Sequence, residues 1–302
     1  MKNNNIIIGG GIAGLITAFY NKDYMLMSKD FGGQHFATNF PLGPRLVKYT
    51  RYTEQLLKDL DILDKISTRK VNVGYYYNNA FYTTVPDELK KEYYRKSRGL
   101  VYDAEPPESA MSDGETTFEV YNMTISDLIY ELILRLALER RLTHDPIKSV
   151  NVARQRIHSE QRSMEYDKLV ITVPLPIFQT LAKEYFDNFK DHLSTLMFRP
   201  ITFILVKTCI FSKPYEYVYY PEKTIKANRA TKFGDHFVLE ITGDYSVSNC
   251  DNIKKLWMGQ IQPPYVETLN VPNVKFIGRY AQWKHNVRIS DVIKSAMELR
   301  NE

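Results

Sequence analysis

The feature that most constrains this chain is a set of three glycines, Gly9, Gly11 and Gly14, that directly follows three isoleucines. The pattern predicts a strand over residues 5–8, a tight turn and a helix over about 13–21. In such a unit the first glycine allows the turn, the second lets the backbone approach a pyrophosphate, and the third permits close packing of helix on strand. The helix N-terminus presents free N–H groups to the anion. The sequence therefore predicts a dinucleotide-binding α/β sheet.

A second strand is expected directly after this helix, over residues 24–28, and the same type of structure returns later in the chain. There we expect a helix over 124–141 capped by Ser126, strands over 147–152 and 168–173, and a turn at 174–176. A strand over 274–277 and a helix over 290–300 capped by Ser290 follow. The intervening residues have the alternating and aromatic pattern of strands, and the lysine-rich stretch 87–100 is expected to be a solvated surface segment.

We therefore predict two domains. A Rossmann-like nucleotide domain, with a parallel sheet assembled from discontinuous segments, is expected to comprise residues 1–70, 124–176 and 265–302. A smaller α+β substrate domain is expected to comprise residues 71–123 and 177–264.

Charge and cysteine content limit the setting. Lys and Arg total 40 against 35 for Asp and Glu, a net charge of +5 that favours an anionic partner without establishing a nucleic acid. Cys209 and Cys250 have neither zinc-site nor disulfide-framework spacing, so we expect no metal and a reduced, cytoplasmic location. No stretch approaches the roughly 18 apolar residues of a spanning helix, so no membrane partner is expected.

The expected ribose contact departs from the usual pattern. Ser28 stands where a carboxylate ordinarily ends the second strand and accepts a hydrogen bond from the ribose. A serine can still bond a hydroxyl, but more weakly than a carboxylate, and Asp30 is a near substitute. We assign Ser28 and Lys29 to the cofactor on this basis.

Four segments resemble the large family of FAD proteins that includes UDP-galactopyranose mutases, protoporphyrinogen oxidases and flavin amine oxidases. They are residues 6–15 together with the glycine pair and glutamine at 32–34, the Gly-Pro turn at 41–45, the strand and Pro turn at 166–176, and the Gly-Arg segment at 276–284. The resemblance implies FAD rather than NAD. Arg45 replaces the histidine of the mutases, and a mutase-like aspartate is absent from residues 285–289.

The resemblance implies a set of cofactor contacts and a set of catalytic candidates. The expected FAD contacts are Gly9, Gly11, Ile12, Ala13, Gly14, Ser28, Lys29, Gly33, Gln34, Pro44, Arg45, Val152, Gly278, Arg279 and Ile289. The candidates for the substrate cleft are Arg45, Arg229, Trp283 and His285, to which His35, Tyr280 and Lys284 are added as neighbours. A cleft with Arg45 and Arg229 would suit an acidic substrate.

Three functions remain open at this stage. The first is an FAD-dependent oxidoreductase that oxidises an amine or amino-acid C–N bond by hydride transfer to flavin. Its substrate would be a small molecule or a modified nucleotide, including an amino-acid-modified thymine base of bacteriophage DNA, as one branch of the family suggests. The second is a UDP-galactopyranose mutase-like isomerase that uses reduced flavin. The third is a non-catalytic flavin-binding protein. The sequence leaves the oligomeric state open.

Overall fold

The computed structural model describes residues 4–33, 46–98, 117–187, 196–207, 215–246, 252–262, 266 and 269–300. One layer of it is a five-stranded parallel sheet with the order β17-β11-β1-β2-β7. Its strands are β1 (Asn5–Gly10), β2 (Tyr24–Phe31), β7 (Leu142–His144), β11 (Leu169–Ile171) and β17 (Val274–Phe276). The direction of winding reverses between β1 and β11, which is where ligands bind in open sheets of this kind. The predicted α/β fold with a discontinuous parallel sheet is confirmed.

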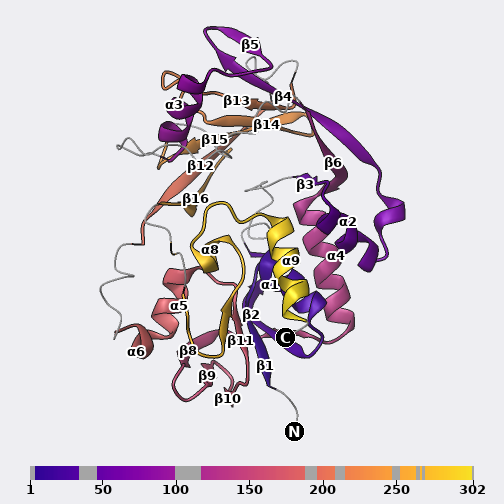
Figure 1. Ribbon diagram of the computed structural model, residues 1–302, viewed down its shortest axis with the longest axis vertical. Helices are drawn as coiled ribbons and strands as arrows, with labels where there is room; N and C mark the ends of the chain where they lie inside the picture. The colour runs from indigo at the N-terminus through magenta and orange to yellow at the C-terminus, as the bar shows by residue number, and fades with distance from the viewer. Residues whose placement is uncertain are drawn as a thin grey trace.

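Two hydrophobic cores cover the two faces of this sheet. The first lies under α1 (Ile12–Tyr20), α2 (Arg51–Asp59), α4 (Ile125–Leu138) and α9 (Ile289–Leu299), which stand together in Figure 1. The second lies under α5 (Leu175–Leu181), α6 (Lys183–Phe186), α8 (Arg279–Gln282) and a three-stranded sheet of β8 (Ile147–Asn151), β9 (Arg156–Ser159) and β10 (Ser163–Glu165). A short 3-10 turn, η2 (Leu63–Lys65), follows α2.

A second, nine-stranded sheet arches over the parallel layer in Figure 1, in the order β16-β12-β15-β14-β13-β4-β6-β3 with β5 paired to β4. Its strands are β3 (Leu46–Lys48), β4 (Thr68–Tyr77), β5 (Ala80–Tyr82), β6 (Thr117–Thr124), β12 (Phe198–Val206), β13 (Tyr217–Tyr219), β14 (Arg229–Phe233), β15 (His236–Thr242) and β16 (Ile253–Ile261). β3 and the start of β4 fall within the stretch 1–70 that was predicted for the nucleotide domain, yet they pair with β6 in this sheet.

Two helix caps differ from those predicted. Thr124, not Ser126, caps α4: its Oγ1 accepts from the Asp127 N–H at 3.2 Å, and the Asp127 carboxylate accepts from the Thr124 N–H at 2.9 Å. At α9 the Arg288 N–H donates to the Asp291 carboxylate at 2.7 Å, and Ser290 lies in the first turn. The expected turn at Pro174 is instead the start of α5, where proline suits the first residues of a helix.

The cap of α4 gives a testable difference between two neighbouring hydroxyls. Thr124→Ala removes the reciprocal cap and is expected to lower the free energy of unfolding by about 1 kcal/mol. Ser126→Ala, two residues later and exposed in the first turn of the helix, is expected to change it by less than about 0.5 kcal/mol. Urea denaturation of the two variants measures both values, and an equal effect would contradict the assignment of the cap.

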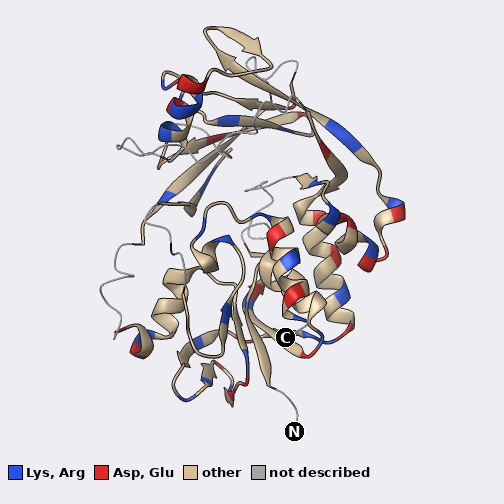
Figure 2. Ribbon diagram, viewed as in Figure 1, with Lys and Arg blue, Asp and Glu red and all other residues tan. Residues whose placement is uncertain are grey.

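The stretch expected to be a solvated surface segment is the helix α3 (Asp87–Arg98), and this expectation was wrong in part. Figure 2 shows charges of both signs along it, but Tyr93 and Tyr94 are buried. Lys96 turns inward, and its ammonium donates to the carbonyls of Tyr220, Glu222 and Ala227. The long stem of a lysine can cover apolar surface while its head bonds the backbone. One face of α3 therefore fixes the chain between β13 and β14.

The burial of Lys96 predicts a pH dependence of stability. Burial lowers the pKa of Lys96 to about 7 from an ordinary value of 10.5. Between these values the unfolded chain binds a proton that the folded chain does not, so the stability contributed by Lys96 rises with pH. The destabilisation caused by Lys96→Met is therefore expected to be larger at pH 9.5 than at pH 6.5 in urea denaturation. Lys91→Met, on the exposed face of α3, controls for loss of a lysine. A larger effect of Lys96→Met at pH 6.5 would overturn the prediction.

Candidate functional site

The glycine turn after β1 is held by contacts that exclude larger residues. A Cβ on Gly14 would lie 1.8 Å from the carbonyl oxygen of Gly9, so α1 can pack against β1 only because residue 14 is glycine. Gly9 itself has a φ of +118°, a conformation that favours glycine. The Thr172 hydroxyl, just beyond β11, lies 3.0 Å from the carbonyl oxygens of Ile8 and Gly9. The turn is therefore a built feature of the sheet edge between β1 and β11.

Gly11 differs from its two neighbours in the motif. It is the N-cap of α1 with a φ of −73°, and a Cβ built on it would meet no atom within 4 Å. The first intrahelical bond runs from the Leu15 N–H to the Gly11 carbonyl at 3.0 Å, so among the described residues the preceding helical N–H groups have no intrahelical acceptor. Space and unsatisfied donors thus coincide at the positive end of the helix dipole.

Two glycines from other parts of the chain lie close to the N-terminus of α1. Gly33, with a φ of +58°, lies so near that its Cβ would be 3.1 Å from the Cα of Gly11. Gly278, with a φ of +104°, would carry a Cβ 2.9 Å from that of Ala13. Three segments that are far apart in the sequence therefore meet at the start of α1 without side chains between them. We refer to Gly9, Gly11, Gly14, Gly33 and Gly278 as the glycine cradle.

Ser28 is tied to this cradle. Its hydroxyl accepts from the Gly10 N–H at 2.9 Å and donates to the Asp30 carbonyl at 2.7 Å. A ribose hydroxyl would have to use the remaining lone pair of Ser28 Oγ. The serine therefore has a structural role here, and its predicted contact with the ribose stays a prediction. Lys29 beside it is exposed.

Arg279 follows Gly278 and begins α8. Its Nε donates to the Val287 carbonyl at 3.2 Å, and neither Nη atom has a hydrogen-bond partner among the residues that the structure describes. Burial lowers the pKa of Arg279; the Tyr280 phenol opposes this shift, and the Arg229 and Arg288 cations add to it. A partly buried cation with unused donors next to a helix N-terminus is suited to an anion.

Arg229 and Glu240 form a bidentate ion pair between β14 and β15. The Arg229 Nε and Nη2 donate to the two carboxylate oxygens at 2.5 and 2.8 Å, and Nη1 donates to the Tyr217 hydroxyl on β13. Although burial opposes the charged form, the Glu240 carboxylate raises the pKa of Arg229, and burial raises that of Tyr217. Glu240 is 7% exposed and Arg229 30% exposed in their side chains.

This ion pair lies at the junction of the two sheets. Arg229 and Glu240 both act electrostatically on Arg279, and the Tyr280 hydroxyl donates to the Gly259 carbonyl on β16 at 3.0 Å. The start of α8 therefore connects the glycine cradle on one side with Arg229 on the other. Arg229 is paired with the buried Glu240 carboxylate, and the same carboxylate acts electrostatically on Arg279.

No protein-family model matches the chain, and no curated protein matches it in sequence. Solved structures do match. A reduced UDP-galactopyranose mutase has a TM-score of 0.72 at 13% identity, covering 99% of this chain and 95% of that one. A fatty acid isomerase from P. acnes has a TM-score of 0.68 at 14% identity, and the match covers 100% of this chain and 99% of that one. Cyclohexylamine oxidase from Brevibacterium oxydans IH-35A has a TM-score of 0.66 at 11% identity, and the match covers 100% of this chain and 98% of that one. The chain has the fold of these enzymes. The expected likeness to mutases and amine oxidases is confirmed at the level of the fold.

The structure brings most of the predicted cofactor residues together. Ile12 and Ala13 follow Gly11 in α1, and Ile289 is the first residue of α9, which packs on α1. Val152 is 5% exposed and belongs to the second core. Gln34, Pro44, Arg45 and the neighbouring His35 lie outside the described residues.

The prediction that Trp283 faces the substrate was wrong. It is 0% exposed, adopts a left-handed conformation after α8, and packs in the second core with Phe276 and Ala281. Its buried indole N–H has no hydrogen-bond partner in the part of the chain that the structure describes. An aromatic residue next to a cleft segment need not face the cleft, because the turn after α8 points this ring inward. His285 is half-buried two residues later.

The sequence analysis missed Glu240 and Tyr217. A signal was present for Glu240: β14 and β15 are joined through Gly234 and Asp235, a two-residue turn that is typical of a β-hairpin. Because such a turn fixes the register, it places residue 229 opposite residue 240. Tyr217 had no comparable signal, since β13 joins β14 through a longer connection.

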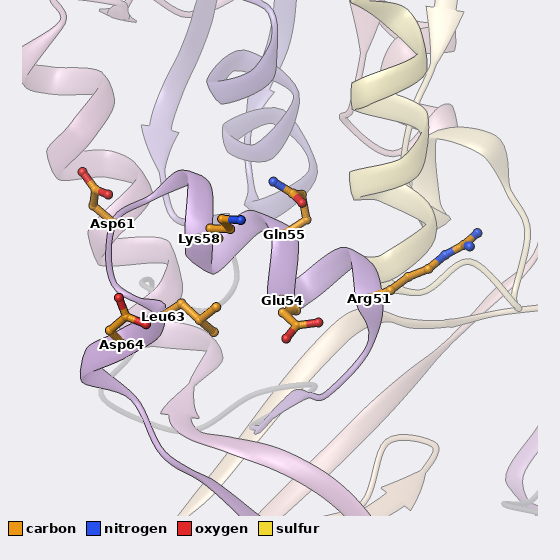
Figure 3. Close-up of a pocket in the computed structure, with 7 residues that line it drawn as sticks. All are labelled: Arg51, Glu54, Gln55, Lys58, Asp61, Leu63 and Asp64. Atoms are coloured by element: carbon orange, nitrogen blue, oxygen red, sulfur yellow. The ribbon is translucent and has the colours of Figure 1, made fainter.

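A separate hollow of about 560 Å³ lies on the outer side of α2. Figure 3 shows its lining side chains on α2 and the turn that follows: Arg51, Glu54, Gln55, Lys58, Asp61, Leu63 and Asp64. It mixes both charge signs and contains none of the predicted site residues. We therefore place the candidate site at the glycine cradle. No helix of the described residues is long and apolar enough to cross a membrane.

Proposed function

We propose that the chain binds FAD with its pyrophosphate at the glycine cradle. The observation that carries this proposal is Gly11, where the described residues leave open space and N–H donors without an intrahelical acceptor, and where Gly33 and Gly278 place no side chain. Arg279 would supply a cation to the same phosphate group. FAD is preferred over NAD because the Gly32-Gly33 pair and the Gly278-Arg279 segment resemble those of FAD proteins.

We infer further that the protein is an FAD-dependent oxidoreductase whose substrate carries an amine and an acidic group. Bound FAD would accept a hydride from the carbon of a C–N bond. The chain would contribute Arg229 at the sheet junction, where its remaining N–H donors suit a carboxylate. Both carboxylate oxygens of its partner Glu240 accept hydrogen bonds from Arg229, and burial raises the pKa of Tyr217, so neither group is placed to take a proton from the amine. The amine would enter in its neutral form.

A different reaction and a more specific substrate can be tested together with this proposal. A mutase-like isomerase is favoured by the likeness in fold to reduced UDP-galactopyranose mutase, whereas Arg45 in place of histidine counts against it. An amino-acid-modified thymine base in DNA would also present an amine and an acid, and the net charge of +5 is compatible with it. A non-catalytic flavin protein is the remaining alternative.

The test begins with the absorption spectrum of the purified chain, with and without added FAD. A flavin spectrum that stays with the protein on gel filtration supports the cofactor assignment, and a chain that cannot be loaded contradicts it. Amines are then added without oxygen: bleaching of the flavin supports oxidation. Turnover of a UDP-sugar only after chemical reduction would favour the mutase, and neither response would leave the non-catalytic alternative.

The acidic part of the substrate is tested separately. Amino acids and the amines that remain after their decarboxylation form matched pairs that differ by one carboxylate. Arg229→Gln is expected to lower kcat/KM for the amino acid by at least about tenfold more than for the amine. Modified and plain duplex DNA are compared by retardation in gels over a range of salt concentrations, and the absence of any retardation removes the nucleic-acid substrate.

A further inference from the structure

The helix α4 is apolar on both sides. Ile125, Leu128, Ile129, Leu132 and Leu136 fill the first core from its inner face. On its outer face Tyr130, Leu134 and Leu138 are 57%, 43% and 75% exposed. The charged residues of α4 are Asp127, Glu131 and Arg135, fewer than in α3. A second apolar face on a helix is ordinarily covered by another element or partner.

The three exposed residues form one continuous stripe. They follow one another at intervals of four residues, so each lies about 6 Å further along the same side of the helix. Isolated apolar residues on a surface are common, but a contiguous row indicates an interaction site. We call Tyr130, Leu134 and Leu138 the α4 stripe.

The charges around the stripe indicate which partner fits it. Asp127 is exposed at the start of the helix, and only one of its carboxylate oxygens is used by the cap. Arg140 is exposed just beyond the end of the helix, and the exposed Glu139 beside it is paired with Arg141 at 3.2 Å. Two copies of α4 side by side in opposite directions would bring the acidic start of each next to the basic end of the other, and would also oppose their helix dipoles. A parallel arrangement would align like charges.

We propose that the α4 stripe is the docking surface for a second copy of this chain, with the two helices antiparallel about a two-fold axis at Leu134. Such an axis places Tyr130 of each copy against Leu138 of the other, because both lie four residues from Leu134. This is the self-complementary contact that a symmetric dimer requires. A single helix face buries less than the roughly 800 Å² per partner of a standard interface, so the dimer is reversible, with a dissociation constant in the micromolar range or weaker.

Sedimentation equilibrium of the full chain over a range of concentrations tests the association. The average mass is expected to rise from one copy towards two, and Leu138→Gln is expected to weaken the dimer at least about tenfold, since it removes one apolar contact from each half. The exposure of Leu138 means that the variant keeps its core. A mass of one copy at all concentrations, or an unchanged association in Leu138→Gln, would overturn the proposal.

Single cysteines test the geometry. Oxidation is expected to cross-link Leu134→Cys, which lies on the axis, but not Leu138→Cys, whose two copies would be about 12 Å apart along the helices and beyond disulfide reach. Ile177→Cys on α5, which is also 43% exposed, is the matched control for random collisions, and the unmodified chain controls for Cys209 and Cys250. Cross-linking through Leu138→Cys, or as much through Ile177→Cys as through Leu134→Cys, would contradict the arrangement.

Discussion

Gly11→Ala is expected to leave the protein folded and to weaken its binding of FAD by tenfold or more. Residue 11 has an ordinary φ of −73°, and its new methyl group would meet no atom of the described residues within 4 Å. Stability should therefore change by less than about 1 kcal/mol, because the lower entropy of the unfolded chain offsets the poorer N-cap. The same methyl group would occupy the space proposed for the pyrophosphate, at a cost of about 1–3 kcal/mol.

Gly14→Ala gives the opposite result and serves as the control. Its Cβ would lie 1.8 Å from the Gly9 carbonyl oxygen, so α1 would have to leave β1, and the expected loss of stability is about 4 kcal/mol or more. Urea denaturation measures the stability of both variants, and equilibrium dialysis measures FAD binding by the folded one. If Gly11→Ala bound FAD as tightly as the unchanged chain, the cradle would not be the pyrophosphate site.

The contrast between these glycines explains why the nucleotide unit could be predicted. The motif is local, because its strand, turn and helix are adjacent in sequence. The steric reason for each of its glycines can therefore be inferred from this one segment. The fold class followed from it, whereas the order of the strands in the sheet did not. Gly33 and Gly278 could be assigned to the same place only through resemblance, because their approach to Gly11 and Ala13 depends on how distant segments pack.

The errors arose where local patterns had two interpretations. Thr124 and Ser126 are both good caps, and the aspartate three residues after Thr124 completes the box, whereas Ser126 has no such partner. The lysine-rich α3 suggested a solvated segment because the composition does not reveal that Tyr93 and Lys96 share its inner face. Trp283 was misjudged because the left-handed turn that points it inward is not a sequence feature.

Loss of Arg229 is expected to destabilise the protein more than loss of Glu240. Arg229→Met removes the bidentate cation from a carboxylate that is 7% exposed, whereas Glu240→Gln leaves a guanidinium that is 30% exposed and still bonded to Tyr217. Breaking a buried pair costs about 3–5 kcal/mol, and the partial exposure of Arg229 reduces the expected cost of Glu240→Gln to about 2 kcal/mol. The surface pair of Arg69 and Glu216 is the control: the single Nη1 of Arg69 donates to both carboxylate oxygens and the pair is more exposed, so Arg69→Met should cost less than about 1 kcal/mol.

The cost of Arg229→Met should depend on pH in a way that identifies its cause. Without the arginine, burial would raise the pKa of Glu240 in the folded protein above that of the unfolded chain. A raised pKa of this kind means that stability is kept at low pH and lost as pH rises through the folded value. Urea denaturation should therefore find a small cost at pH 4.5 and the full cost at pH 8, and replacing both residues by methionine should recover most of the stability at pH 8. A cost that does not change with pH would mean that Arg229 stabilises the junction by packing rather than by neutralising Glu240.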